Sequence, residues 1–178
     1  NNCRKNDYDE DSLQARVQYR PSEDSSLGGF VGYTRRDYDQ GNRHFRGLTA
    51  GFDTEWAVSG AVQMRASLGR SIEPDDDAVT GSYADTWSLN FSPTIQATGK
   101  ITVEPYLRLY DRRYKGDQLA AGQVERKDKI YMVGAEADYE FRRNMFLMAS
   151  ISREQRDSNR ANLDYKANVF GLGLKVQF

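Results

Sequence analysis

Charged and tyrosine side chains recur at every second position in several stretches of this sequence. One series, between residues 104 and 110, alternates glutamate, tyrosine and arginine, and another, between residues 136 and 140, is acidic throughout. In contact with water, such groups can screen ions by charge and hydrogen-bond sugar hydroxyls, and tyrosine rings can support sugar faces. The candidate residues for this chemistry are Arg16, Arg20, Asp53, Glu55, Arg65, Glu104, Tyr106, Arg108, Tyr110, Glu136, Asp138 and Glu140.

The positions between these polar residues are apolar, which predicts strands with two different faces. The clearest case is the last run, residues 168–178, where glycine, lysine and glutamine alternate with large apolar side chains. A period of two residues fits a strand and not a helix. About ten residues of tilted strand suffice to cross a bilayer, with one face toward lipid. The apolar positions of this run are Phe170, Leu172, Leu174, Val176 and Phe178.

Nine runs of this kind can be marked from residue 13 onward, and the connections between them alternate between short and longer. This pattern predicts an all-β, antiparallel, up-and-down transmembrane β-barrel. Bacterial barrels have short periplasmic turns and a girdle of aromatic residues at each membrane interface. With the short turns placed in the periplasm, the sequence predicts which aromatic residues form each girdle. The periplasmic girdle is Tyr19, Trp56, Phe91, Tyr139, Phe141, Phe146 and Phe178, and the outer one is Tyr33, Phe45, Tyr83 and Tyr131.

Two details of the run pattern leave alternatives open. Pro105 cannot donate to a strand ladder, so we expect a bulge or bend there. Residues 136–150 could instead be helical, although their clean alternation favours strands. A soluble β-barrel or sandwich would bury the apolar face internally, and the aromatic girdles and the terminal Phe178 argue against it.

An odd number of strands conflicts with the even number that single-chain bacterial barrels normally have. The first run has to descend from the outer side, which makes residues 1–12 the remnant of an extracellular loop. We therefore expect residues 1–178 to be the C-terminal part of a larger, even-stranded barrel. The alternatives are a barrel closed between chains and a miscounted first strand.

Composition limits the possible partners and chemistry. Charged residues make up 29% of the 178 residues, with 25 basic and 26 acidic side chains and no basic block, so nucleic acid is not expected to bind. Cys3 is the only cysteine, which excludes an intrachain disulfide and a thiolate metal site. We expect no metal and no cofactor, and we read the acidic run at residues 75–77 as a solvated loop.

The closing stretch, residues 153–160 followed by 164–174, resembles the C-terminus of the putative β-barrel porin type 2 family. The turn at residues 19–22 is similar as well. Members of that family are commonly associated with exopolysaccharide synthesis and export systems, so the resemblance implies a barrel in a polysaccharide-secretion pathway. Full-length members are longer than this chain, and the resemblance supplies no catalytic residues.

These observations lead to an expected function in the outer membrane of a Gram-negative bacterium. The leading hypothesis is a non-enzymatic, hydrated pore that passes exopolysaccharide out of the cell. A second is an outer-membrane hydrolase with its chemistry at the extracellular rim near His44, and a third is a plugged, structural or surface-interaction barrel. The expected partners are outer-membrane lipid and lipopolysaccharide, the barrel-insertion machinery that reads the C-terminal strand, polysaccharide, and periplasmic export components.

Overall fold

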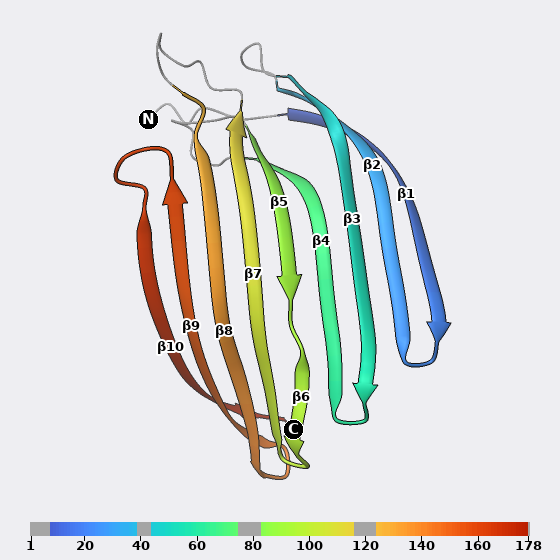
Figure 1. Cartoon of the computed structure of the whole chain (residues 1–178), viewed down its shortest axis with the longest axis vertical. Helices are drawn as coiled ribbons and strands as arrows, with labels where there is room; N and C mark the ends of the chain where they lie inside the picture. The colour runs from blue at the N-terminus through green and yellow to red at the C-terminus, as the bar shows by residue number, and fades with distance from the viewer. Residues whose placement is uncertain (1–7, 39–43, 75–82, 116–123, 178) are drawn as a thin grey trace.

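The computed structural model describes residues 8–38, 44–74, 83–115 and 124–177, which form one antiparallel sheet of ten strands (Figure 1). Their order across the sheet is their order in the chain, except that β5 and the short β6 share one position between β4 and β7. The strands are β1 (Tyr8–Ser22), β2 (Ser25–Tyr38), β3 (His44–Ser59), β4 (Val62–Pro74), β5 (Tyr83–Phe91), β6 (Thr94–Thr98), β7 (Ile101–Lys115), β8 (Lys127–Arg142), β9 (Met145–Ser158) and β10 (Tyr165–Val176).

This arrangement confirms the all-β, antiparallel, up-and-down prediction. The helical alternative for residues 136–150 is wrong, because those residues belong to β8 and β9, which pair along almost their whole length. No helix long and apolar enough to cross a membrane occurs among the residues that the structure describes.

Strand register assigns every side chain to one of two faces, because residues directly opposite each other point the same way. In the β9–β10 pair, Leu172 lies opposite Ala149, and the next residue, Gly173, lies opposite Met148 on the other side. We call the two sides the apolar face and the polar face. Large apolar side chains are exposed along the whole apolar face, and the most exposed of them, Leu172, retains 86% of its accessible surface.

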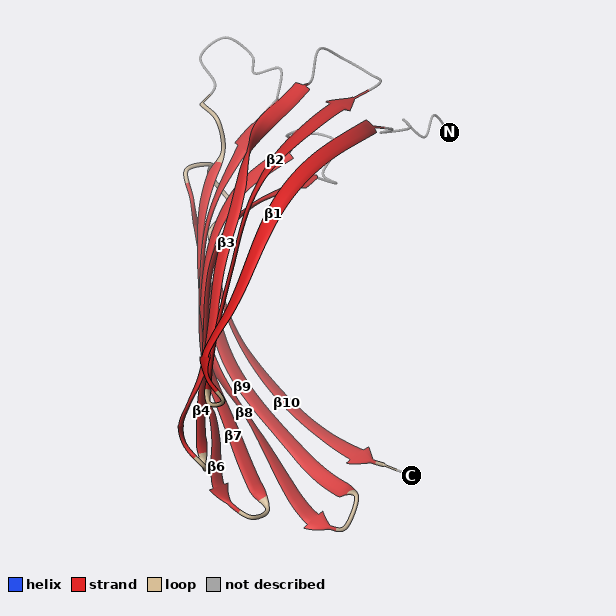
Figure 2. Cartoon of the chain, turned by 90° about the vertical axis from the view of Figure 1, so that its right-hand side faces the viewer, coloured by secondary structure: helices blue, strands red, loops and turns tan. Residues whose placement is uncertain are grey.

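Most of the buried side chains lie on the polar face, near the end of the sheet opposite the short turns; they include Thr34, Arg36, Thr86, Tyr114 and Asp128. Figure 2 shows the sheet edge-on, bowed along its length. Side chains on the inside of such a curve are crowded together, whereas those on the outside spread apart. The lower exposure of the polar side chains therefore places the polar face on the concave side.

The strands continue beyond the apolar band at the end opposite the short turns. Strand β1 starts at Tyr8, so the prediction that residues 1–12 are a loop is wrong for residues 8–12. Ser12 lies opposite Thr34, and the Arg36 guanidinium donates to the Glu10 carboxylate across the same pair of strands. Cross-strand ion pairs hold this polar extension together, and an apolar pattern cannot reveal it.

The bend expected at Pro105 lies on the neighbouring strand. Strand β7 pairs with β8 in unbroken register from Ile101 to Arg113, with Pro105 opposite Ala135. On its other side, the gap between β5 and β6 contains Ser92 and Pro93, and the flanking pairs Phe91↔Leu107 and Ile95↔Val103 place Pro93 opposite Pro105. Because neither proline has an N–H group, the β5/β6 ladder is interrupted here, while β7 keeps its continuous pairing with β8.

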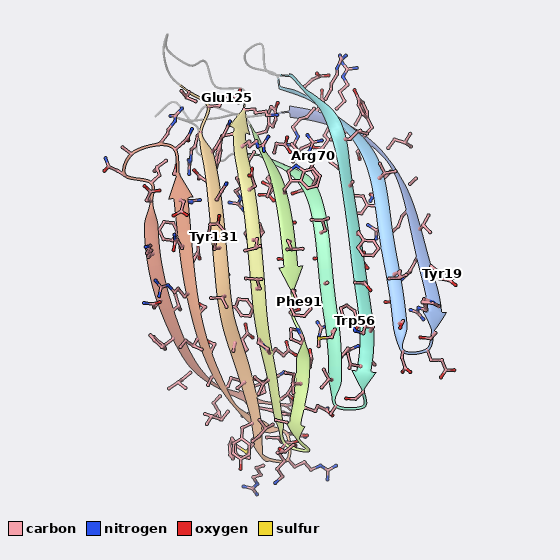
Figure 3. The ribbon with its side chains drawn as sticks, in the orientation of Figure 1. Tyr19, Trp56, Arg70, Phe91, Glu125 and Tyr131 are labelled. Carbon is pink, nitrogen blue, oxygen red and sulfur yellow. The ribbon has the colours of Figure 1, made fainter. Side chains whose placement is uncertain are left out.

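The structure places the residues of the predicted aromatic girdles at different heights on the sheet. Figure 3 shows Tyr19 and Trp56 toward the ends with short turns and Tyr131 in the other half of the sheet. Phe91 departs from the prediction, because the chain continues through β6 and leaves Phe91 in mid-face opposite Ala66 and Leu107. Phe146 lies on the polar face opposite Glu140 and Lys175, so it is no part of a girdle. Phe178 and the Phe45 side chain lie outside the described part.

Candidate lumen-facing surface

Register brings all of the candidate residues for polar chemistry onto the polar face, apart from Arg20, which lies near the end of β1 where the register with β2 shifts. The supporting opposite pairs come from every region of the sheet: Arg16↔Phe30, Asp53↔Ser67, Glu55↔Arg65, Glu104↔Glu136, Tyr106↔Gly134, Arg108↔Met132, Tyr110↔Ile130, Thr102↔Asp138 and Glu140↔Phe146. Arg20 lines a hollow of about 750 Å³ near the same turns, together with Glu55 and Gln63.

A hydrogen-bonded network crosses the polar face near the short turns. The Arg65 guanidinium donates to the Thr94 hydroxyl at 2.8 Å, and that hydroxyl donates to the Glu104 carboxylate at 3.3 Å. Beside it, Gln63 donates to Glu55, which lies opposite Arg65 in the β3–β4 register. The network links β3, β4, β6 and β7 through side chains that remain partly exposed, so it orders this region without filling it.

Acidic side chains dominate the neighbouring part of this face on β8. Glu136 lies directly opposite Glu104, and Asp138 follows on the same face, opposite Thr102. Like charges in opposite positions destabilise a sheet unless water separates them. The arrangement therefore favours a hydrated surface with a negative potential close to the short turns.

Tyrosine and arginine alternate along the polar face of β7. We call this set the Tyr–Arg series; it consists of Tyr106, Arg108, Tyr110, Arg112 and Tyr114. Each guanidinium stands near a ring: the distance to the ring centroid is 4.5 Å for Arg108 over Tyr106 and 5.7 Å for Arg112 over Tyr110. Members of the same kind repeat every four residues, which is about 13 Å along a strand.

Gly134 lets the first ring of this series lie close to the backbone of β8. A Cβ built at Gly134 would stand 2.6 Å from the Tyr106 ring and 2.7 Å from the Ile151 carbonyl oxygen. No other residue type fits in this place without moving the ring. Glycine opposite an aromatic ring is a recurrent device in sheets, and it keeps Tyr106 flat on the surface.

The outer end of the polar face holds a charged cluster that the sequence patterns did not single out. The Asp128 side chain is 0% exposed and accepts hydrogen bonds from the Arg126 guanidinium at 2.7 Å and the Ser158 hydroxyl at 2.7 Å. Arg156 stands 3.5 Å from the same carboxylate, and Arg126 lies over the Tyr114 ring at 4.1 Å. The cluster ties the ends of β7, β8 and β9 together.

A simple signal in the sequence could have found part of this region. The alternation that gives Tyr106, Arg108 and Tyr110 continues without a break to Arg112 and Tyr114. For Asp128 there is no comparable signal, because it pairs through the fold with Ser158 and Arg156, about thirty residues away.

Some candidate residues fall outside the part of the chain that the structure describes. They include Cys3 and the acidic run at residues 75–77. His44 belongs to β3, opposite Asp37, but its side chain is not among those described. Within the described ranges, no group of three or more His, Cys, Asp or Glu side chains is placed to hold a metal ion.

An antiparallel meander with one exposed apolar face, one polar face and aromatic residues flanking the apolar band defines an outer-membrane β-barrel. The chain belongs to the family described as Putative beta-barrel porin 2, whose model matches residues 6–178. It is therefore a porin-like barrel of the bacterial outer membrane.

A solved outer-membrane receptor shows the same kind of fold. The alcaligin outer-membrane receptor FauA of Bordetella pertussis is similar with a TM-score of 0.62 and 13% identity, covering 93% of this chain and 34% of that one. The chain thus spans about a third of the receptor's length. The β domain of the Bordetella autotransporter BrkA has a TM-score of 0.44 and 14% identity, covering 94% of this chain and 78% of that domain. A comparison with curated proteins gave no match.

Proposed function

We propose that the polar face lines a hydrated pore that passes exopolysaccharide across the outer membrane. The observation that carries this proposal is the Tyr–Arg series on β7. Its rings lie along the strand, in the direction in which a polymer would cross the membrane. Tyrosine rings offer flat apolar surfaces for sugar faces, and arginines donate several hydrogen bonds to hydroxyl and carboxylate groups.

The partial exposure of these groups supports passage rather than tight binding. Tyr106, Arg108 and Tyr110 are intermediate or exposed. Conduction needs contacts that are favourable enough to admit a substrate and weak enough to release it. A series of similar, open contacts meets this condition. Because passage through such a series requires no catalytic group, we infer a role in transport and not in catalysis.

The two edges of the sheet require further strands in this proposal. Within the described residues, β1 pairs only with β2, and β10 pairs only with β9. An unpaired strand edge in a bilayer leaves backbone groups without hydrogen-bond partners, so membrane sheets close into barrels. We infer that additional strands, from a longer chain or from a second copy, complete the wall between β1 and β10.

The partners that we propose follow from this placement. Strand β10 presents its alternating apolar face to the barrel-insertion machinery, and the ends with short turns face the periplasm, where export components would deliver the polymer. Outer-membrane lipid and lipopolysaccharide cover the apolar face.

The open pore can be tested through Arg108, which is exposed and has Tyr106 as its ring partner. Arg108→Glu is expected to shift the ion selectivity toward cations, because it replaces a positive charge in the lumen by a negative one. The measurement is the reversal potential in planar bilayers under a salt gradient, using protein purified from outer membranes. Lys100→Glu, in the turn before β7, is the matched control, and equal reversal potentials for all three proteins would contradict an open lumen.

The polysaccharide itself can be tested at Tyr110. An acidic polysaccharide added to the periplasmic side of the same bilayers is expected to interrupt the current. Tyr110→Ala should weaken this block by about threefold to tenfold, the contribution expected of one aromatic contact. Tyr33→Ala removes a tyrosine from the apolar face and should leave the block unchanged. A polymer that never interrupts the current, or one that blocks both variants equally, would refute the assignment of this cargo.

A further inference from the structure

A group of basic side chains stands at the outer end of the apolar face, over β4, β7 and β8. Their register partners place them on this face: Arg70 lies opposite Trp87, Lys115 opposite Tyr83, and Lys129 opposite Asp111. They lie level with Trp87 or beyond it, and beyond Tyr131, on the side away from the short turns. We call this set the outer basic group; it consists of Arg70, Arg113, Lys115, Lys127 and Lys129.

Acidic neighbours neutralise only part of this positive charge. The Asp85 carboxylate is shared between Arg70, at 2.8 Å, and Lys115, at 3.4 Å. Asp111 pairs with Arg113 at 3.2 Å. Asp157 lies opposite Lys129 on the next strand. Among the described side chains at this end of the apolar face, the basic ones therefore outnumber the acidic ones, and Lys127 and Lys129 are both exposed.

An apolar groove of about 230 Å³ adjoins this group on the same face. Leu68 and Leu89 line it on one side and Tyr131 on the other, and Lys129 stands at its margin. On β7, Asp111 lies between the larger Trp87 of β5 and Lys129 of β8, and Leu109 lies beside the larger Tyr131 of β8. A narrow apolar groove with a cationic end matches a lipid that carries both an acyl chain and a phosphate.

We propose that this surface binds one lipopolysaccharide molecule through its lipid A part. The phosphate groups meet the outer basic group, above all Lys127 and Lys129, and one acyl chain lies in the groove beside Trp87. The height of the site supports this occupant, because the outer leaflet is the one in which phosphorylated glucosamine lipids place their headgroups. The proposal rests on the apolar face and does not depend on what the pore carries.

The first test is a titration of the purified outer-membrane protein, in detergent micelles, with diphosphoryl lipid A. Each basic residue near an anionic lipid surface contributes about 1 kcal/mol, or about fivefold in affinity. The double variant Lys127→Ala with Lys129→Ala should therefore bind lipid A roughly 25-fold more weakly. The matched control, Lys100→Ala with Arg143→Ala, removes the same charge at the short turns and should bind as the parent does.

The second test separates the groove from the charges. Leu109→Trp fills the groove and should weaken lipid A binding several-fold, while binding of the deacylated, phosphorylated glucosamine disaccharide stays the same. The lysine double variant and the Leu109→Trp variant are first shown to keep the heat-dependent electrophoretic mobility of the folded barrel.

Two outcomes would overturn the proposal. One is that lipid A binds the lysine double variant and the groove variant as tightly as it binds the parent. The other is that phosphatidylglycerol displaces lipid A at equal concentration, which would show a general attraction of anionic lipid and no site for this one.

Discussion

Replacing Leu172 with arginine is expected to reduce the amount of assembled barrel severely. Leu172 lies on the apolar face of β10, opposite Ala149, and is 86% exposed in the sheet. In the membrane this exposure is contact with lipid. A charged side chain near the bilayer midplane of a barrel costs about 2–4 kcal/mol. The measurement is the fraction of protein in the outer membrane that shows the electrophoretic mobility of the folded barrel.

The neighbouring residue supplies a control for this experiment. Gly173 lies on the polar face opposite Met148, and a Cβ placed there would meet only the Met148 Cβ, at 3.8 Å. Gly173→Arg introduces the same charge one residue away and should leave assembly nearly unchanged, because its side chain points to water. If Gly173→Arg were the more damaging of the two, the assignment of the faces would have to be reversed.

The second large effect is expected at Asp128. Asp128→Asn keeps the shape of the side chain but removes the negative charge that Arg126 and Arg156 approach. The Arg126 and Arg156 side chains are 7% and 21% exposed, so their positive charges would then lack a buried counter-ion. Breaking a buried ion pair by removing one partner typically costs about 3–5 kcal/mol. The measurement is the free energy of unfolding in urea, with the protein reconstituted in lipid vesicles.

Asp138→Asn provides the matched comparison. Asp138 lies on the same strand and the same face, but it is only half-buried and forms no salt bridge with another described side chain. Its substitution should change the free energy of unfolding by less than about 0.5 kcal/mol. Equal effects of the two substitutions would mean that the Asp128 cluster does not stabilise the ends of β7, β8 and β9.

The faces of the strands were predictable from the sequence because lipid and water impose opposite demands on alternate residues. This alternation is complete in β10, where Leu172 and Gly173 fall on the expected sides. The same alternation puts Glu104, Tyr106 and Arg108 on one face, whichever strands lie beside β7. The face on which each of these side chains lies follows from the local order of residue types. The fold determines only which residues lie opposite them on the neighbouring strands.

The polar ends of the strands were not predictable in the same way. Residues 8–12 and 127–130 carry charges on both faces, so no alternation marks them as strands. Pairing with a distant partner decides their structure: Glu10 with Arg36, and Asp128 with Ser158. The effect of Pro105 was misplaced for a related reason, because the proline that it faces, Pro93, belongs to another strand.

The order of the strands also bears on how the sheet assembles. Every neighbour in the sheet is the next strand in the chain, with β6 as a continuation of β5. Each new strand can therefore dock on the one before it by closing a hairpin, and contacts between residues close in sequence form quickly. In the closed barrel that we propose, we expect the slow event to come last, when the outer edges of β1 and β10 acquire their final partners. Substitutions in inner hairpins should accordingly act on stability, whereas changes along those two edges should act on the rate of closure.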